Sequence, residues 1–256
     1  MLRFGAPIAS VILTATLLAF PSPVAGEPYL AGYLGAAITQ DKDLDIDLGL
    51  SALGPIADGK IKDVSFDNAL LYGGKVGYFF EGFLGGGLGI ELDGYHFSPE
   101  IGQQRVTFKG TVFGVPTTTQ ATLHGDLELT GIGVNVLYRV PVLQDTTFPR
   151  GRLQPYVGVG IAAAIARLEL QTFVLDGRPT TQDTSVRPAV HALGGVRFFL
   201  TPRIALFTEY KFVHTGEFEF DFKRTATLGG TLVTESSTAR TRLTDHLFSG
   251  GVAFHW

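Results

Sequence analysis

The sequence predicts an all-β fold, an eight-stranded antiparallel up-and-down transmembrane β-barrel, and three observations lead to it. First, eight segments alternate between two kinds of side chain with a period of two. Second, 45% of the residues are hydrophobic and 17% are charged, yet no apolar run after Phe20 is long enough for a membrane helix. Third, short and long connections between the segments take turns. Apolar character spread by alternation is the sequence signature of a transmembrane barrel.

The N-terminus predicts a secretory signal peptide over residues 1–26, followed by a barrel domain over residues 27–256. Arg3 supplies the positive charge, residues 8–20 form an uncharged apolar run, and Val24-Ala25-Gly26 offers short side chains for cleavage. The run is shorter than the ~20 residues that a membrane-spanning helix needs, which argues against an anchor. The chain has no cysteine, so a lipidated N-terminal cysteine and disulfides are excluded.

The eight alternating segments put large apolar side chains on one face and small or polar ones on the other. In the fifth, Val157, Val159 and Ile161 alternate with glycines. In the seventh, residues 218, 220 and 222 are phenylalanines that alternate with acidic residues. Apolar faces directed at lipid and small residues in a crowded lumen fit a barrel. The segments are residues 28–39, 69–80, 84–97, 126–140, 153–169, 186–200, 204–221 and 242–256.

The connections predict that both termini lie on the periplasmic side. Short turns are expected around residues 81–83 and 201–203, and a moderate one at 141–152. Residues 103–123 offer an extra hairpin, interpreted as an extension outside the bilayer. The long connections are residues 40–68, 98–125, 170–185 and 222–241. Aromatic residues beside the short turns predict an interface girdle, namely Tyr78, Phe79, Phe80, Phe83, Tyr138, Phe198, Phe199, Phe207, Phe254 and Trp256.

Charges of both signs fall on the predicted inward face, and they are the candidate functional residues. An eight-stranded barrel is only wide enough for side chains, so these charges are expected to form a paired network that plugs the lumen and fixes the register. A gate or narrow ion path is the alternative. Glu209 and Lys211 share one inward face, with Arg197 expected near them. The inward set is Lys75, Glu91, Asp93, Arg139, Arg187, His191, Arg197, Glu209 and Lys211.

No motif predicts a metal, a cofactor or a catalytic residue. The acidic run from Asp41 to Asp47 lacks the glycine and glutamate of a calcium loop, so it is interpreted as a strand extension above the membrane that continues the phase of the first strand. His246 with Ser249, and His214 with Glu217, are three residues apart and point to opposite faces of a strand. The net charge of −4 argues against a nucleic-acid partner.

The signal peptide, the eight segments and the terminal Phe254-x-Trp256 resemble the small outer-membrane β-barrel family, similar to the barrel domain of OmpA and to porin-family proteins. The resemblance implies the outer membrane of a Gram-negative bacterium, contact with its lipid and lipopolysaccharide, and an aromatic end, Phe254 and Trp256, that the barrel-assembly machinery reads. Residues 207–212, 229–232 and 245–247 also look like barrels with lipid A oxidase activity. That match transfers no catalytic residue.

The sequence therefore predicts a monomeric outer-membrane barrel with a structural or surface-interaction role and no enzymatic activity. Two alternatives stay open, a lipid A-modifying enzyme and a narrow porin-like channel.

Overall fold

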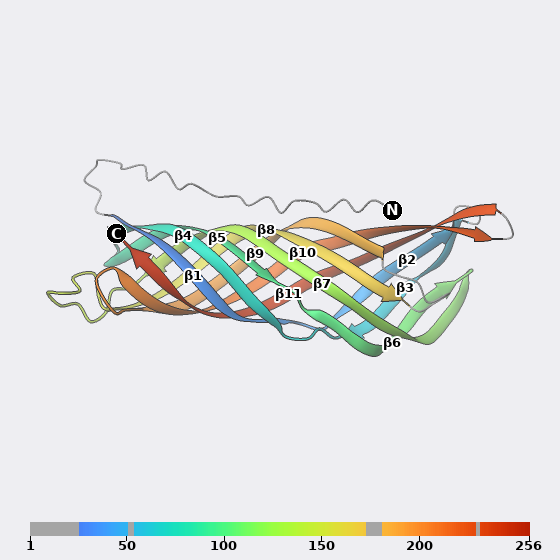
Figure 1. Cartoon of the computed structure of the whole chain (residues 1–256), viewed down its shortest axis with the longest axis horizontal. Helices are drawn as coiled ribbons and strands as arrows, with labels where there is room; N and C mark the ends of the chain where they lie inside the picture. The colour runs from blue at the N-terminus through green and yellow to red at the C-terminus, as the bar shows by residue number, and fades with distance from the viewer. Residues whose placement is uncertain (1–25, 51–53, 173–180, 229–230) are drawn as a thin grey trace, which may run out of the picture.

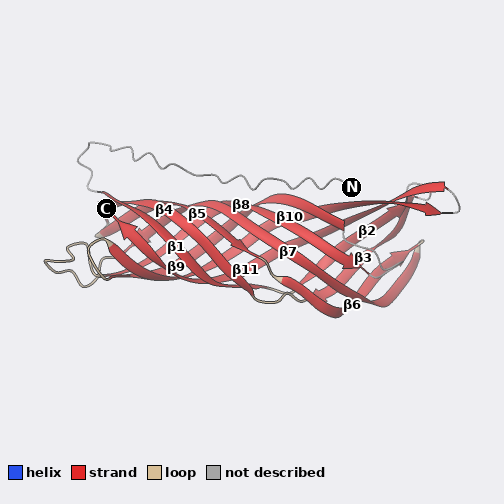
Figure 2. Cartoon of the chain, in the orientation of Figure 1, coloured by secondary structure: helices blue, strands red, loops and turns tan. Residues whose placement is uncertain are grey.

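The computed structural model describes residues 26–50, 54–172, 181–228 and 231–256, and this part of the chain is almost entirely antiparallel β-structure (Figure 2). The predicted signal peptide, apart from Gly26, lies outside the described residues. No described segment is a helix of the length and apolarity needed to cross a membrane. The strands are β1 (Gly26–Thr39), β2 (Lys42–Leu50), β3 (Gly54–Val64), β4 (Ala69–Phe83), β5 (Gly86–Phe97), β6 (Glu100–Val112), β7 (Val115–Arg139), β8 (Leu153–Thr172), β9 (Thr181–Phe199), β10 (Ile204–Leu228) and β11 (Thr231–His255).

Eight of these strands close a ring, which confirms the predicted barrel. Its order is β1, β4, β5, β7, β8, β9, β10 and β11, and β11 pairs with β1 to close it. Each of the eight segments predicted from the period-two pattern overlaps one of these strands. The wall lies along the long axis of the molecule, with the C-terminus at one end (Figure 1).

The barrel wall continues well beyond this ring. The expected long connections 40–68 and 98–125 contain β2, β3 and β6, which pair with one another and with β7 and β11. The extra hairpin expected at 103–123 is confirmed, because β6 and β7 meet at a tight turn where Phe113 and Gly114 have φ of 49° and 77°. We call β2, β3, β6 and the parts of the neighbouring strands beside them the outer tier; it occupies the right end of Figure 1.

The inward face changes phase at two places where the outer tier begins, once within β10 and once between β1 and β2. On β10 the pairing with β11 shifts between His214 and Glu217, and beyond this bulge Phe218 and Phe220 are fully buried. The assignment of the 218–222 phenylalanines to lipid was therefore wrong, because one extra residue turns them into the interior. The inward face also changes between Thr39 and Leu44, so the acidic run is a strand, as predicted, but it does not continue the phase of β1.

The interior has two different halves. In the outer half it is apolar, with Phe97, Leu129, Phe218 and Leu243 at 0–1% exposure. Charged residues and rings fill the other half, which contains residues 26 and 256 and which we call the periplasmic half after the predicted orientation; inward glycines make room for the rings. A Cβ added to Gly77 would lie 2.6 Å from the ring of Tyr29. Three of the aromatics expected in the interface girdle are buried in this half instead of facing lipid, namely Phe79, Phe199 and Phe207.

Candidate functional site

The periplasmic half of the lumen holds five buried charged residues that reach toward one another from three strands. Lys75 comes from β4, Glu91 and Asp93 come from β5, and Glu209 and Lys211 come from β10. Each lies on the inward face of its strand because the period-two pattern places it two or four residues from other inward positions. We call these five residues the central cluster.

Lys75 joins two sides of the barrel. Its Nζ lies 2.7 Å and 2.6 Å from the two carboxylate oxygens of Glu209, and 3.5 Å from Oε1 of Glu91. In the ring, β1 and β11 separate β4 from β10, so the ion pair between Lys75 and Glu209 spans the lumen.

Lys211 makes a second crossing. Its ammonium forms an ion pair with Asp93, and it lies 3.7 Å from Oε1 of Glu209. Because β5 and β10 lie on opposite sides of the ring, this pair crosses the full width of the barrel. The two lysines and three carboxylates therefore link opposite sides of the lumen.

Neutral side chains satisfy the remaining carboxylate oxygens. Tyr29 donates to Glu91 at 2.6 Å, Tyr33 to Asp93 at 2.8 Å and Tyr156 to Glu209 at 2.9 Å. The amide of Asn135 donates to Glu91 at 2.7 Å and is hydrogen-bonded in turn to the predicted inward residue His191. Sequence reasoning missed these tyrosines and Asn135, although alternation along their strands puts them in phase with the inward charges.

Arg197 contacts rings instead of a carboxylate. The centre of its guanidinium lies 4.4 Å from the ring centroid of Tyr29 and 5.4 Å from that of Phe79. Among the described residues it forms no ion pair with Glu209. The reason is the stagger of the strands, because Arg197 is opposite Phe207, and Glu209 is opposite Gly195. A planar cation over aromatic faces is a favourable contact in a buried site.

A second set of charges closes the periplasmic end. Arg139 forms an ion pair with Glu27, and its guanidinium donates to Glu81 at 2.7 Å and to Gln154 at 2.9 Å. Nδ1 of His255 lies 2.5 Å from Oε1 of Glu27. We call these five residues the periplasmic cluster, and the two clusters with Asn135, His191 and Arg197 the lumen network. Sequence reasoning missed Glu27 and His255, since the ends of the barrel were assigned to cleavage and to an aromatic signal.

The charges of the central cluster and Arg197 balance. The positive groups are Lys75, Lys211 and Arg197, and the negative groups are Glu91, Asp93 and Glu209, so with His191 neutral three charges of each sign sum to zero. All six are at most 4% exposed. No net charge is therefore buried in this part of the lumen, which limits the desolvation cost of these groups.

Other predicted positions lie outside this network. Arg187 is half-buried, and its Nε donates to the carbonyl of Glu217 at 2.6 Å. His246 faces outward and bonds to Tyr210 at 2.7 Å, and Nδ1 of His214 lies 3.1 Å from the hydroxyl of Thr244. Neither histidine contacts its suggested partner, Ser249 or Glu217, among the described residues. The described residues contain no group of three or more His, Asp or Glu placed to hold a metal ion.

The segments that look like lipid A oxidases do not converge. Glu209 and Lys211 lie deep in the lumen, while Asp245 accepts a hydrogen bond from Thr39 at 2.7 Å and the adjacent His246 faces outward. Gly229 and Gly230 lie outside the described residues.

The outer tier carries its own surface ion pairs. Arg240 of β11 lies 2.5 Å from Asp47 of β2 and 3.2 Å from Glu219 of β10. The hydrogen bond to Glu219, with that to Asp47, raises the pKa of Arg240. Part of the acidic run from Asp41 to Asp47 is thus engaged in holding neighbouring strands.

The terminal aromatic pair lies on the lipid-facing side. Phe254 and Trp256 are 46% and 45% exposed, and their rings stack at 6.0 Å.

A family model described as the outer membrane protein beta-barrel domain matches residues 11–253. No curated protein matches the chain significantly. Among solved structures, Neisserial surface protein A is similar at 14% identity and a TM-score of 0.38, covering 88% of this chain and 97% of its own. OprG from Pseudomonas aeruginosa is similar at 12% identity and a TM-score of 0.44, covering 91% and 96%. Ail of Yersinia pestis is similar at 12% identity and a TM-score of 0.35, covering 90% and 99%.

Proposed function

We propose, given that this chain belongs to the outer membrane protein β-barrel domain family and lies in the outer membrane of a Gram-negative bacterium, that it is a sealed barrel with a structural and surface-interaction role. Its periplasmic half closes the lumen, and its outer tier presents a charged wall to the cell exterior. We take the working form as a monomer, assembled through its aromatic end and surrounded by outer-membrane lipid and lipopolysaccharide.

The lumen network is the observation that carries this proposal. Lys75 and Lys211 each reach carboxylates on strands across the ring, and tyrosine hydroxyls occupy the space between. Ions that entered would have to separate buried, compensated pairs, and removing one partner of such a pair is costly. The same contacts support sealing more than conduction, which argues against the porin-like alternative.

Planar-bilayer recording tests the sealed state. We expect the purified protein to show little steady conductance, and Glu209→Gln to show more frequent openings, because the substitution removes the negative charge that is paired with Lys75. An exposed-pair variant, Glu128→Gln, is the matched control and should behave as the parent, since its ion pair with Arg167 is solvent-exposed. A large, stable conductance in the parent contradicts the proposal and makes the network a selectivity lining.

The lipid A-modifying alternative has less support. Its characteristic segments place Glu209 in the sealed lumen and His246 on the opposite side of the wall, so they do not form one reaction centre. Incubation of the reconstituted protein with lipid A, followed by mass spectrometry of the lipid, is the direct test. A modified product would revive this alternative.

A further inference from the structure

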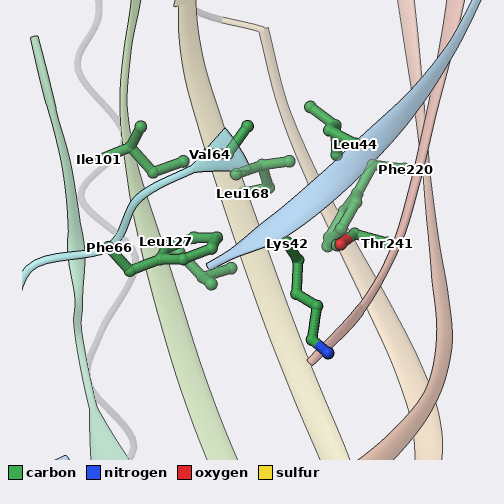
Figure 3. A pocket seen from close by; sticks show the side chains of 9 residues that line it. All are labelled: Lys42, Leu44, Val64, Phe66, Ile101, Leu127, Leu168, Phe220 and Thr241. Atoms are coloured by element: carbon green, nitrogen blue, oxygen red, sulfur yellow. The ribbon is translucent and has the colours of Figure 1, made fainter. Parts of the chain in front are cut away.

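The interior of the outer tier offers little space for a ligand. A cavity lined by Leu44, Val64, Phe66 and Phe220, among others, measures about 20 Å³ (Figure 3), which is roughly the room that one water molecule needs. The opposite end of the barrel instead carries exposed groups that have hydrogen-bond donors to spare. They lie on the periplasmic rim, where the connection 141–152 projects from the same end as the C-terminus (Figure 2).

The connection 141–152 is held in one shape by hydrogen bonds within itself. Oδ1 of Asp145 accepts the N–H of Phe148 at 2.7 Å, and the N–H of Asp145 donates to the carbonyl of Phe148 at 3.3 Å. At the base of the loop, the N–H of Arg152 donates to the carbonyl of Leu143 at 3.1 Å. Phe148 and Arg152 are therefore presented from a fixed backbone.

The same loop contains a strained residue. Leu143 has a φ of 55°, in the left-handed region, and its side chain is 61% exposed. Such a conformation costs a non-glycine residue about 1–3 kcal/mol and persists only where the surrounding contacts fix the backbone. The loop thus does more than connect β7 to β8, because its shape is maintained against strain.

Arg152 contacts two aromatic rings. The centre of its guanidinium lies 5.2 Å from the ring centroid of Phe148 and 5.0 Å from that of Phe198. Within the described part of the chain only its Nε donates, to the carbonyl of Phe199 at 3.4 Å, and no carboxylate lies at ion-pair distance. An arginine on aromatic rings is already oriented, and its terminal nitrogens are free to donate to a planar pair of oxygens.

This guanidinium lies at the edge of the lipid-facing surface. Phe198 points outward and is 36% exposed, and the next outward residue, Leu200, is 49% exposed. Phe254 and Trp256, at the same end of the barrel, are exposed members of the predicted interface girdle. Exposed aromatic side chains mark the level of the lipid head groups. Arg152 is therefore expected at the depth of the lipid phosphates.

The free charges on this part of the rim are positive. Arg203, in the turn between β9 and β10, is exposed, and its guanidinium forms no hydrogen bond or ion pair with any described residue, the terminal carboxylate included. The nearby acidic side chains are engaged, because Glu27 and Glu81 pair with Arg139 and Asp145 bonds to its own loop. This balance favours a head group with a net negative charge over one that also carries a cation.

We propose that Arg152 binds the phosphate of an anionic glycerophospholipid, of the phosphatidylglycerol class, at the periplasmic rim. The guanidinium donates to two phosphate oxygens, Arg203 adds a second positive charge, and the acyl chains lie along the outward face of β9. The fixed loop and the two rings orient the arginine in advance, so that little conformational freedom is lost on binding. This inference goes beyond the sealed-barrel role and does not depend on it.

Native mass spectrometry of the full protein released from lipid nanodiscs tests the site. The nanodiscs contain phosphatidylglycerol and phosphatidylcholine in equal amounts and with the same acyl chains, in both leaflets, so the orientation of the barrel does not affect the result. We expect phosphatidylglycerol to be retained preferentially. Arg152→Gln should reduce this retention about tenfold, the worth of one charge-assisted hydrogen bond.

Arg167→Gln is the matched control, because Arg167 is exposed at the other end of β8 and should not contact the head group. If Arg152→Gln does not assemble, Arg152→Lys replaces it; it keeps the charge but loses the planar fork, and its retention should lie between those of the parent and the control without lipid preference. Equal retention of the two lipids by the parent, or unchanged retention in Arg152→Gln, would overturn the proposal.

Cross-linking locates the bound lipid. Phosphatidylglycerol with a diazirine in its head group should label peptides that contain Phe148, Arg152 or Phe198, and phosphatidylcholine should compete poorly. Inorganic phosphate should not displace it, because the acyl chains contribute to binding. Displacement by phosphate would indicate a site for the free anion, and labelling confined to the band around Leu34 and Leu70 would mean annular lipid only; either result would contradict the proposal.

Discussion

Glu209 is the residue on which the central cluster depends most. It accepts hydrogen bonds from Lys75 at both carboxylate oxygens and from Tyr156, and it lies within ion-pair distance of Lys211. Its side chain is 1% exposed. Since an uncompensated buried cation is much more costly than an exposed one, the loss of this single carboxylate should be felt by two lysines.

Glu209→Gln should lower the free energy of unfolding by about 1–3 kcal/mol. Glutamine keeps the volume and one acceptor oxygen, but it leaves Lys75 with Glu91, at 3.5 Å, as its remaining carboxylate partner. The shift between folded and unfolded bands on gels, measured against urea concentration, gives the change in stability.

A double variant identifies the partner. Glu209→Gln with Lys75→Gln should recover part of the loss, because the orphaned ammonium is removed as well. Glu128→Gln, which breaks an exposed contact of 3.7 Å with Arg167, should cost under about 1 kcal/mol. A single variant as stable as the parent would mean that Glu209 is in contact with water.

The sequence could predict which charges face inward, but not which charges meet. Period-two alternation places Lys75, Glu91 and Glu209 on inward faces from their own strands alone. Whether Lys75 reaches Glu209 depends on ring order and on the stagger between strands. For the same reason Arg197 was expected beside Glu209. The offset between β9 and β10 instead places the Arg197 guanidinium over the ring of Tyr29.

At the scale of elements, regular alternation along a strand predicted the strand well, whereas the points where the alternation breaks were not predicted. The ring strands carry long runs of alternation, so all eight were predicted. The β2–β3 hairpin was taken for a connection because its charged outward face resembles a polar loop. The bulge after His214 was missed because a single extra residue leaves the alternation on both sides intact and changes only which face it belongs to.

The phase change on β10 predicts the effect of truncating one phenylalanine. Phe218→Ala should destabilise the outer tier by about 3–5 kcal/mol, because the ring is fully buried and stacks on Phe220 with 6.0 Å between centroids. The measurement is the rate of amide hydrogen exchange in the outer tier, because exchange reports local opening of this part without unfolding of the eight-stranded barrel.

Phe113→Ala is the matched control for this variant. Its side chain is 67% exposed at the β6–β7 turn, so the same truncation should change stability by no more than about 0.5 kcal/mol. Equal and small effects at the two positions would show that Phe218 faces outward, as the uninterrupted pattern suggested.

The whole molecule is a barrel far taller than a membrane requires. β7, β10 and β11 each have 25 residues, which at ~3.3 Å per residue gives roughly 80 Å of strand, whereas about 10 residues cross a bilayer. The polar lumen network lies in the half whose outer surface carries exposed apolar side chains such as Leu34, Val159 and Ile161, and the apolar core lies in the other half. Paired charges thus fill the interior of one half, and packed apolar side chains fill the interior of the other.

Closure of this barrel depends on the pairing of β11 with β1, and that pairing reaches to the final residues. Phe254 is opposite Leu30, His255 is opposite Tyr29, and the N–H of Trp256 donates to the carbonyl of Pro28. His255 also contacts Glu27 inside the lumen. The last three residues therefore combine ladder hydrogen bonds, a lumen contact and the lipid-facing aromatic pair.

Deletion of Phe254–Trp256 should abolish assembly, with the chain recovered as periplasmic fragments and not in the outer membrane. An open strand edge in lipid leaves backbone groups unpaired, which costs several kcal/mol for each group. Two substitutions divide the causes. His255→Gln removes the contact with Glu27 but keeps the strand, so it should assemble with lower stability. Trp256→Phe keeps an aromatic end and should assemble as the parent does. Normal outer-membrane levels of the truncated chain would show that these residues neither close the barrel nor signal its assembly.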